Sequence, residues 1–521
     1  MTFFFVLLVC YLTICNYYFN DYLMMKTSSP LLNNFFKYLS GLILGLSFYL
    51  FFIALFNRSF ADYDLWGYLS FGRVFWEDGF FPYKDIFAYT PTKPLWVYHE
   101  WLTGVVFWGL IKHLGPASLQ LLRYIMAILT IYLIYSTALK RGGTLFYVII
   151  ILIPSILLIS FGYNPVRAQI FTFFFFILTL YILEYSKKTG DGTILRWLPL
   201  IQIGWCNFHG GFVSGLGLIF LYALGEGLAR KKNAVSYLKW GIIASFATLI
   251  NPYGIEYWIY TIHAISMPRP EITEWYSVAT ALKSNFNIFP VSLFLIMSLI
   301  SLLFFFVRNK KDITEFLVIA VVIYLGSVHV RHGVLFGLVF GAYMPVFLSE
   351  FANEWNAKHR SFMRLFRFLP VIILALLIST SFYFYPIKQI NFIPSFKLFV
   401  SADYYPTKAI SWMKANNIKG NILPNFEWGE YLSWSLYPDY RVAMDGRYET
   451  VYEDNLHKEY FDFLYGRDGW DIFLKKYPHD IVLLKAGTKI HSLMINEKDW
   501  RMVYNDNKNV IFLKNNTINK L

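Results

Sequence analysis

Two aspartates, Asp62 and Asp64, stand where a long apolar segment (residues 42–56) gives way to a polar loop. Ionisable side chains at a membrane boundary are costly unless they face a polar cavity, so both are candidates for function. Two carboxylates one residue apart can act as a general base, as metal ligands, or as both. The alternative is that one of them caps a helix that starts near Leu65. An isolated Asp-x-Asp pattern favours the cap, so the choice depends on the surrounding sequence.

The composition indicates a membrane protein. Of the 521 residues, 57% are hydrophobic and 15% are charged, whereas soluble proteins are about half apolar and about a quarter charged. The net charge of +13 would also suit a nucleic-acid-binding protein, but the basic residues lie in loops between apolar blocks. Orientation in the bilayer explains them, and no nucleic-acid partner is expected. The three cysteines lie in apolar segments, which indicates neither a disulfide framework nor a cysteine-based zinc site.

The loops predict the topology. Five basic clusters are expected in the cytoplasm by the positive-inside rule, and four loops rich in Gly, Pro, Asn and His alternate with them on the outer face. The basic clusters begin at Lys140, Lys187, Arg230, Arg308 and Lys358, and the outer loops begin at Asn164, Asn207, Asn251 and His329. The predicted spans are residues 42–56, 119–139, 144–161, 170–182, 197–206, 212–228, 235–250, 286–307, 313–328, 334–348 and 368–383.

The chain is therefore predicted to be a polytopic α-helical membrane protein of about 11–12 spans with a C-terminal extracytoplasmic α/β domain. Residues 1–37 are an apolar segment, either an extra span or sequence upstream of a start at Met24 or Met25. Residues 38–385 form the membrane domain, with a first outer loop at 57–116. Within this loop, residues 66–77 and 99–113 are predicted as helices along the membrane surface. Residues 386–521 form the soluble domain, with a helix at 407–416 and strands at 481–484 and 510–513.

The first outer loop carries further motifs, a Gly-x-x-Pro turn at Gly79 and a Lys-Pro-Leu-Trp stretch at Lys93. Together with the acid after the first span, they resemble the GT-C glycosyltransferases, such as protein O-mannosyltransferases and lipid A aminoarabinose transferases. In those families the first outer loop carries the catalytic acid a few residues before an aromatic residue. Asp64, four residues before Tyr68, matches that acid. Lys93 matches the lysine of the family's Lys-Pro-Pro-Leu stretch, although the second proline is missing here.

The resemblance is closer still to an uncharacterised bacterial branch of GT-C-like proteins, and it spans most of the chain. The motifs that carry it are Asp-Leu-Trp at Asp64, Glu-Trp-Leu at Glu100, Arg-x-Gln at Arg167, Trp-x-Asn-x-His-Gly-Gly at Trp205, Asn-Pro-Tyr-Gly at Asn251, Trp-Gly-x-Tyr-Leu at Trp428 and Asp-Gly-Arg at Asp445. This resemblance implies a GT-C-like fold in a bacterial inner (cytoplasmic) membrane, with the active site on the extracytoplasmic side.

The function implied is transfer of a sugar from a polyprenyl-phosphate donor to a glycan, lipid or protein acceptor. Asp64 is the expected base with Asp62 beside it, and a divalent ion such as Mg²⁺ or Mn²⁺ bridging the pair to the donor phosphate is compatible with this but not required. Cationic or polar residues expected at the donor phosphate are Arg331, His332, Arg167, His209 and Lys93, and candidates for acceptor binding are Glu100, Asn207 and Arg447.

Each of these groups also has a structural interpretation. His209 is equally consistent with a hydrogen-bonded interfacial histidine, and Arg331 with snorkelling to lipid headgroups. Asp445-Gly446-Arg447 is first a turn after a strand at 441–444, with a surface arginine. The aromatic residues from Trp428 to Trp434 are more readily core than sugar-stacking groups. The alternative functions are a polysaccharide polymerase or ligase, and a non-catalytic transporter or assembly protein. The absence of an inverted repeat in the sequence argues against a transporter.

Overall fold

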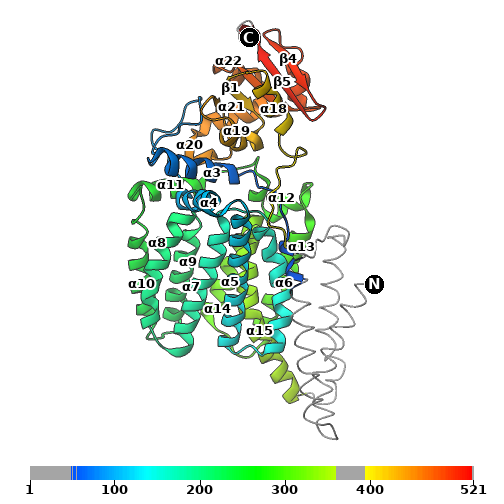
Figure 1. Cartoon of the computed structure of the whole chain (residues 1–521). Coiled ribbons are helices and arrows are strands. Elements are labelled where there is room, and N and C mark those ends of the chain that lie inside the picture. The colour runs from blue at the N-terminus through cyan, green and yellow to red at the C-terminus, as the bar shows by residue number, and fades with distance from the viewer. Residues whose placement is uncertain (1–48, 50, 54, 359–393, 519–521) are drawn as a thin grey trace, which may run out of the picture.

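The computed structural model describes residues 49, 51–53, 55–358 and 394–518. Figure 1 shows a helical bundle with a smaller, sheet-containing domain at one end. Five of the described helices are long and apolar enough to cross a membrane: Ala117–Arg141 (α5), Leu145–Tyr163 (α6), Gln169–Thr189 (α7), Ile288–Val307 (α13) and Val330–Glu354, which comprises η4 (Val330–His332) and most of α15 (Gly333–Lys358). Shorter apolar helices are Phe212–Leu228 (α9), Ala234–Ala247 (α10) and Ile313–Val328 (α14).

The predicted spans match this helical bundle. The spans predicted at 212–228 and 313–328 coincide with α9 and α14, and α8 (Leu198–Phe208) stands for the short span at 197–206. Helices α7 and α15 extend beyond their predicted spans of 170–182 and 334–348, because each helix continues from its apolar segment into the polar residues that follow. The predicted span at 368–383, the N-terminal segment 1–37 and the boundary at 385/386 lie outside the described residues, as does most of the span at 42–56.

Three helices lie between the bundle and the C-terminal domain (Figure 1). The surface helices predicted at 66–77 and 99–113 are α3 (Leu65–Arg73), continued by the π-helical turn η1 (Val74–Asp78), and α4 (Trp101–Leu114). They cross at Gly72 and Gly104, where a Cβ on Gly72 would lie 2.1 Å from the Gly104 carbonyl oxygen. Glycine therefore allows the two backbones to touch. The third helix, α11 (Ile255–Ser266), is not predicted by the sequence analysis.

The C-terminal domain is α/β, as predicted. Its strands are β1 (Gly420–Pro424), β2 (Tyr440–Val442), β3 (Ile481–Lys485), β4 (Trp500–Asn505) and β5 (Asn509–Lys514), and their order in the sheet is β2-β1-β3-β5-β4. Strand β1 pairs with β2 and β3 in parallel, and β5 pairs antiparallel with both β3 and β4. Strand β3 begins Ile-Val-Leu-Leu and is buried on both faces, as expected for the centre of a sheet covered by helices. The helices of this domain are α18 (Thr407–Ala415), α19 (Gly429–Leu436), α20 (Tyr448–Val451), α21 (Asp454–Tyr465), α22 (Asp471–Lys476), α23 (Lys489–Met494) and α24 (Asn515–Ile518). The remaining short helices are η2 (Thr193–Trp197), η3 (Thr273–Trp275), α12 (Val278–Lys283) and η6 (Phe426–Trp428).

Aromatic residues of the C-terminal domain pack against α3. The Trp66 ring contacts the rings of Tyr431 and Trp434 with centroid distances of 4.9 and 6.1 Å, and the Arg73 guanidinium lies 4.4 Å from the Trp434 ring centre. Trp428 is buried in the core of the domain. These aromatic residues therefore pack the fold, as the structural interpretation of the sequence expected.

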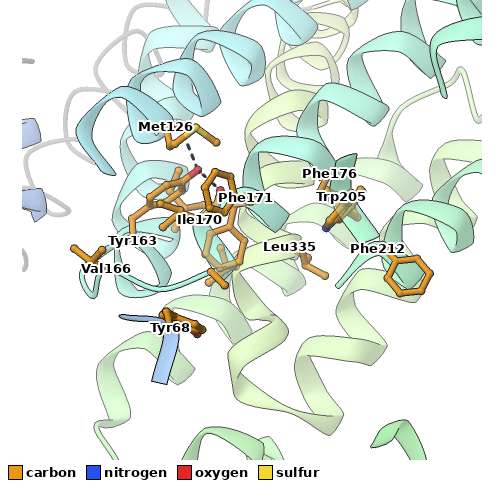
Figure 2. Packing of buried hydrophobic residues seen from close by; sticks show 14 of the residues in the cluster. Tyr68, Met126, Tyr163, Val166, Ile170, Phe171, Phe176, Trp205, Phe212 and Leu335 are labelled. Atoms are coloured by element: carbon orange, nitrogen blue, oxygen red, sulfur yellow. Dashed lines mark hydrogen bonds between the residues drawn. The ribbon is translucent and has the colours of Figure 1, made fainter. Parts of the chain in front are cut away.

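The bundle is held together by large buried side chains that carry polar tips. Figure 2 shows Tyr163 beside Met126 and Ile170, whose backbone oxygens lie 3.4 and 3.3 Å from the Tyr163 hydroxyl. The Tyr163 hydroxyl lies 2.6 Å from the Thr130 hydroxyl, so a polar group buried in the bundle is satisfied.

Some of the basic residues at the end of the bundle away from the C-terminal domain are paired with acids. Arg141 lies 2.6 Å from Glu315, and Lys187 lies 2.8 Å from both Glu226 and Asp312. These contacts join the ends of α5, α7, α9 and α14. Two of the predicted basic clusters thus also contribute to packing, because an unpaired charge buried there would be costly.

Candidate functional site

A cavity of about 1730 Å³ lies where the membrane helices, the surface helices and the C-terminal domain meet. The cavity wall near the surface helices and the C-terminal domain is polar. The wall between the membrane helices α6, α7, α9, α13 and α14 is apolar. Side chains representative of the apolar wall are Leu158, Phe173, Leu218, Phe294, Val318 and Leu325. Of the residues predicted from the sequence, those lining the cavity are Asp64, Glu100, Arg167, His209, Arg331, His332 and Arg447.

Asp64 precedes α3, but in the described part of the chain its side chain makes no capping hydrogen bond to that helix. Its carboxylate keeps 39% of its surface exposed and lies 3.4 Å from the Arg167 Nε. Asp62 accepts the Asp64 backbone N–H at 3.2 Å and also accepts a hydrogen bond from Arg167 Nε. The helix-cap interpretation therefore does not fit Asp64. Asp62 instead orients both its neighbour and the arginine.

The surroundings of Asp64 tune its basicity. Burial raises the pKa of Asp64 to about 6, and the nearby Asp62 carboxylate adds to this, while Arg167 acts in the opposite direction. A carboxylate with this pKa is ionised at neutral pH and is a stronger base than an exposed aspartate. This combination is the one expected of a general base.

Cations line the cavity beside Asp64. Arg167 Nη1 lies 2.6 Å from Glu274, and Arg331 approaches the other oxygen of Glu274 at 3.9 Å. The guanidinium of Arg331 lies 4.8 Å from the ring centre of Trp275, and that of Arg269 lies 4.2 Å from the same ring. The Arg331 guanidinium keeps N–H groups for a phosphate while it stacks on this ring, whereas Arg269 donates to the Met267 and Ala264 carbonyl oxygens and pairs with Glu449.

Glu274 holds this cationic group together and was not singled out from the sequence. Burial would raise its pKa, but Arg167 and then Arg331 outweigh burial and lower it, so this carboxylate is ionised. Its signal in the sequence is weak, since one acid in a polar loop is unremarkable. Only the approach of two arginines from other elements identifies it.

A second acid, Glu100, lies among polar aromatic and histidine side chains. Its Oε1 accepts a hydrogen bond from the Tyr68 hydroxyl at 3.3 Å and lies 3.5 Å from the Nε2 of His209. Its Oε2 lies 3.7 Å from the Nε2 of His99. Burial, and then the Asp64 charge, raise the pKa of Glu100 to about 8. Glu100 is therefore largely a neutral acid at neutral pH, unlike Asp64.

The C-terminal domain contributes a third acid, Glu430, which the sequence analysis missed. Its carboxylate accepts the Gly67 N–H at 3.0 Å. A Cβ on Gly446 would lie 2.8 Å from Glu430 Oε1 and 3.6 Å from Asp64 Oδ1, so this glycine of the Asp-Gly-Arg turn leaves room for both acids. Burial, and then Asp64, raise the pKa of Glu430 well above its usual value. The soluble domain thus completes the wall around Asp64.

Three of the predicted site residues hold loops in place. Lys93 donates to the Glu449 carbonyl oxygen at 2.6 Å and is not among the cavity-lining residues described. Asn207 accepts from Trp101 Nε1 at 2.9 Å. Arg447 lines the cavity, but its guanidinium pairs with Asp445 at 2.7 Å and with Asp85, and its side chain is 2% exposed. The turn predicted at this position is present, but its arginine is a buried ion-pair partner rather than a surface residue, because two acids surround it.

A preformed metal site is not evident in the described residues, which contain no group of three or more His, Cys, Asp or Glu side chains placed to hold an ion. Asp62 and Asp64 share Arg167 as their partner. In this arrangement the oxygens of both carboxylates contact one guanidinium.

Comparison with known proteins identifies the fold. No protein-family model matches the chain, and no curated protein matches it in sequence. Among solved structures, it is similar to the Archaeoglobus fulgidus oligosaccharyltransferase tethered to an acceptor peptide containing the NVT sequon. The TM-score is 0.50 at 12% identity, over 85% of this chain and 69% of that one. The chain thus has a fold similar to that of an oligosaccharyltransferase, and five of its described helices are long and apolar enough to cross a membrane.

Proposed function

We propose that this protein is a glycosyltransferase that moves a sugar from a polyprenyl-phosphate donor to an acceptor on the extracytoplasmic side of a bacterial inner membrane. The observation that carries the proposal is the shared cavity. Asp64 and Arg331 both line it, and Arg167 and Glu274 connect them through contacts of 3.4, 2.6 and 3.9 Å. One phosphosugar can therefore reach a base and a cation together.

The shape of the cavity supports a lipid-linked donor. Its polar upper part would hold the sugar and phosphate, and its apolar wall between membrane helices would hold the first part of a polyprenyl chain. A phosphate attached to such a chain stays at headgroup depth, where Arg331 and Arg167 lie at the ends of membrane helices. The similarity in fold to an oligosaccharyltransferase is consistent with this kind of substrate.

The chemistry assigned to the residues is a single displacement at the sugar's anomeric carbon. Asp64 takes the proton of the acceptor hydroxyl while the acceptor oxygen bonds to the anomeric carbon. The bond between this carbon and the phosphate oxygen breaks, and its electron pair goes to the phosphate. Arg331 and Arg167 stabilise the charge that develops on the phosphate. Attack opposite the leaving group inverts the anomeric configuration.

The test is the Asp64→Asn variant, because Asn keeps the shape of the side chain and removes the base. Cells lacking the protein would receive the wild type, Asp64→Asn or Asp78→Asn, and their envelope glycans, lipids and proteins would be compared by mass spectrometry. Asp78 is a matched control, an exposed aspartate in the same outer loop. We expect a glycosylated product with the wild type and Asp78→Asn, and at least a 100-fold loss with Asp64→Asn at equal membrane levels. Normal product from Asp64→Asn would remove Asp64 from the mechanism.

A further inference from the structure

A line of hydrogen-bonding side chains runs through the cavity wall away from Asp64. It begins at His209, whose orientation is fixed by its neighbours. The Gly211 N–H donates to His209 Nδ1 at 2.9 Å, so in the neutral ring the proton lies on Nε2. Thr172 also contacts this Nδ1, at 2.7 Å, and is itself held by the indole N–H of Trp205 at 2.8 Å. His209 therefore presents an N–H to Glu100.

Glu100 is an asymmetric carboxyl group in this arrangement. Its Oε1 faces two donors, the Tyr68 hydroxyl and His209 Nε2, while among the described residues its Oε2 faces His99. When the carboxyl is neutral, its proton therefore belongs on Oε2, 3.7 Å from the Nε2 of His99. This contact is longer than a hydrogen bond, as catalytic contacts often are before substrate closes the site.

The line continues through Tyr260 to Glu449. The Tyr260 hydroxyl lies 3.0 Å from His99 Nδ1 and donates to Glu449 at 3.5 Å. Since Glu449 as a carboxylate can only accept, both contacts form together only if His99 Nδ1–H donates to Tyr260. Glu449 is fixed by Arg269 at 2.9 Å. All donors then point the same way, from Glu100 toward Glu449.

The charges around the line favour this state. Burial lowers the pKa of His99 to about 4, so the ring is neutral. Burial would raise the pKa of Glu449, but the Arg269 guanidinium outweighs burial and lowers it, so that end is ionised. The charged or titratable groups that face Glu100 are Asp64, Tyr68, His99, His209, Arg331 and Glu449.

We propose that Glu100, His99, Tyr260 and Glu449 form a proton-transfer chain that clears the reaction proton from Asp64 between turnovers. The inference rests on the proposed function, since it needs a base that is protonated in each cycle. It adds a role for the cavity wall: when substrates displace water from the cavity, protons still have a path around them.

Each transfer makes one bond and breaks one. The O–H bond at Glu100 Oε2 breaks as an N–H forms at His99 Nε2. The N–H at His99 Nδ1 breaks as an O–H forms on Tyr260, whose original proton passes to Glu449. The Glu100 carboxylate then takes the proton of Asp64 through one cavity water, and Glu449 releases its proton to water. His99 returns to its starting tautomer by losing the Nε2 proton to water and gaining one from water at Nδ1, and the Tyr260 hydroxyl turns back toward Glu449. Asp64 is again ionised, and no oxidation or reduction occurs.

Tyr260→Phe interrupts the chain at its centre, and Tyr257→Phe is the matched control. Both tyrosines lie on α11, and the Tyr257 hydroxyl contacts His99 as well, but at its backbone carbonyl oxygen at 3.4 Å. Glu100→Gln is the second variant, because its amide can still accept from Tyr68 and donate to His99 but cannot move a proton.

The first measurement compares single-turnover and steady-state transfer in proteoliposomes supplied with polyprenyl-phosphate sugar and the acceptor found in envelope extracts. We expect Tyr260→Phe to keep the single-turnover rate, because Asp64 starts ionised, and both Tyr260→Phe and Glu100→Gln to lose about 100-fold in steady state. Millimolar imidazole should restore the Tyr260→Phe rate by carrying the proton. The proton-transfer chain would be overturned if Tyr260→Phe had the same steady-state rate as Tyr257→Phe. It would also be overturned if Tyr260→Phe lost equally in single-turnover and steady-state transfer and imidazole restored neither rate.

The second measurement needs no substrate, so it separates this inference from the proposed function. Infrared difference spectra of the purified protein across a pH titration should show the carbonyl stretch of protonated carboxylic acids at neutral pH. Glu100→Gln should remove one component of this band and leave the component of Glu430, which Glu430→Gln removes. The titration midpoint of the Glu100 component should move in Tyr260→Phe and stay in Tyr257→Phe. No such component, or equal midpoints in the two tyrosine variants, would contradict the chain even if sugar transfer were established.

Discussion

At the scale of single residues, the candidate site separates acids by their surroundings. Asp64 faces a cationic group and remains ionised, whereas Glu100 and Glu430 are buried among neutral or acidic neighbours that favour their protonated forms. Carboxyl groups with different proton affinities in one cavity allow different tasks: one accepts a proton and the others hold one. The assignment depends on packing, which the spacing of the residues in the sequence does not reveal.

The raised pKa of Glu430 has a consequence for stability. A carboxyl whose folded pKa lies above its unfolded value stabilises the fold below the unfolded pKa, and this contribution is lost as pH rises through the folded pKa. Glu430→Gln keeps the acceptor for Gly67 and removes the titration. We therefore expect the apparent melting temperature of Glu430→Gln to gain on that of the wild type as the pH is raised from acid to alkaline values.

Glu427 supplies the opposite control for this measurement. Burial would raise its pKa, but Lys485 and the Asn425 side chain outweigh burial and lower it. The contribution of Glu427 to stability is present above its unfolded pKa and is lost as pH falls through its folded pKa. The apparent melting temperature of Glu427→Gln should therefore lie below that of the wild type at neutral pH and approach it in acid. Parallel curves for wild type and Glu430→Gln at all pH values would mean that Glu430 is not buried as an acid.

Residues of the site could be predicted where their types are unusual for their surroundings. Asp64, Arg167 and Arg331 stand beside apolar segments, where a charge is costly and so conspicuous. Glu274 and Glu430 stand in polar stretches, where an acid is ordinary, and only the tertiary packing shows that they face the cavity. Lys93 was expected at the phosphate from the family resemblance. Its contact with the Glu449 carbonyl oxygen instead joins the first outer loop to the C-terminal domain.

At the scale of elements, the crossing of α3 and α4 sets the positions of both acids, because Asp64 precedes one helix and Glu100 the other. A Cβ on Gly104 would lie 2.7 Å from the Tyr68 backbone oxygen, which cannot move aside as a side chain could. We expect Gly104→Ala to push the helices apart, to cost about 1–3 kcal/mol of stability and to lower sugar transfer. Thermal unfolding and the envelope assay measure the two effects.

Gly227→Ala is the control for this crossing. It also lies in a helix, α9, but its Cβ would meet only the Ala234 Cβ at 3.9 Å, an ordinary contact. Alanine there should be neutral or slightly stabilising, since it favours helix over glycine by about 1 kcal/mol. If Gly104→Ala behaved like Gly227→Ala, the close crossing would not be what positions the acids.

Elements were predictable to the extent that apolar length alone determines them. Helices α9 and α14 coincide with their predicted spans because charged or turn-forming residues bound each apolar run. Helix α11 was missed because it is short, rich in tyrosine and tryptophan, and neither fully apolar nor clearly soluble. Because α11 carries Tyr260, the cavity-lining residues of this helix were not identified from the sequence either.

At the scale of the whole molecule, the C-terminal domain closes over the first outer loop and supplies part of the cavity lining, from Asn425 to Lys489. The two are joined by short bridges between Ala88 and Val442 and between Thr92 and Tyr452. The sequence predicted both parts but not their contact, since the residues that meet are several hundred positions apart. Burial of Glu430 and the resulting pKa shift are products of that contact.

The ion pairs of Arg447 are the charged part of this contact. The side chains of Arg447, Asp445 and Asp85 are 2%, 0% and 1% exposed, so removing the cation leaves two buried carboxylates unpaired. We expect Arg447→Met to cost about 3–5 kcal/mol and to separate the domain from the loop. The loss should show as a lower apparent melting temperature and faster proteolysis between the two parts.

Lys419 provides the matched comparison, since its pair with Asp439 joins side chains that are 53% and 56% exposed. Lys419→Met should change stability by less than about 1 kcal/mol, because water and salt screen an exposed pair. Equal effects of the two substitutions would show that the buried pair does not hold the domain over the cavity. In that case Asp64 would keep its proton affinity in Arg447→Met, and sugar transfer would survive the substitution.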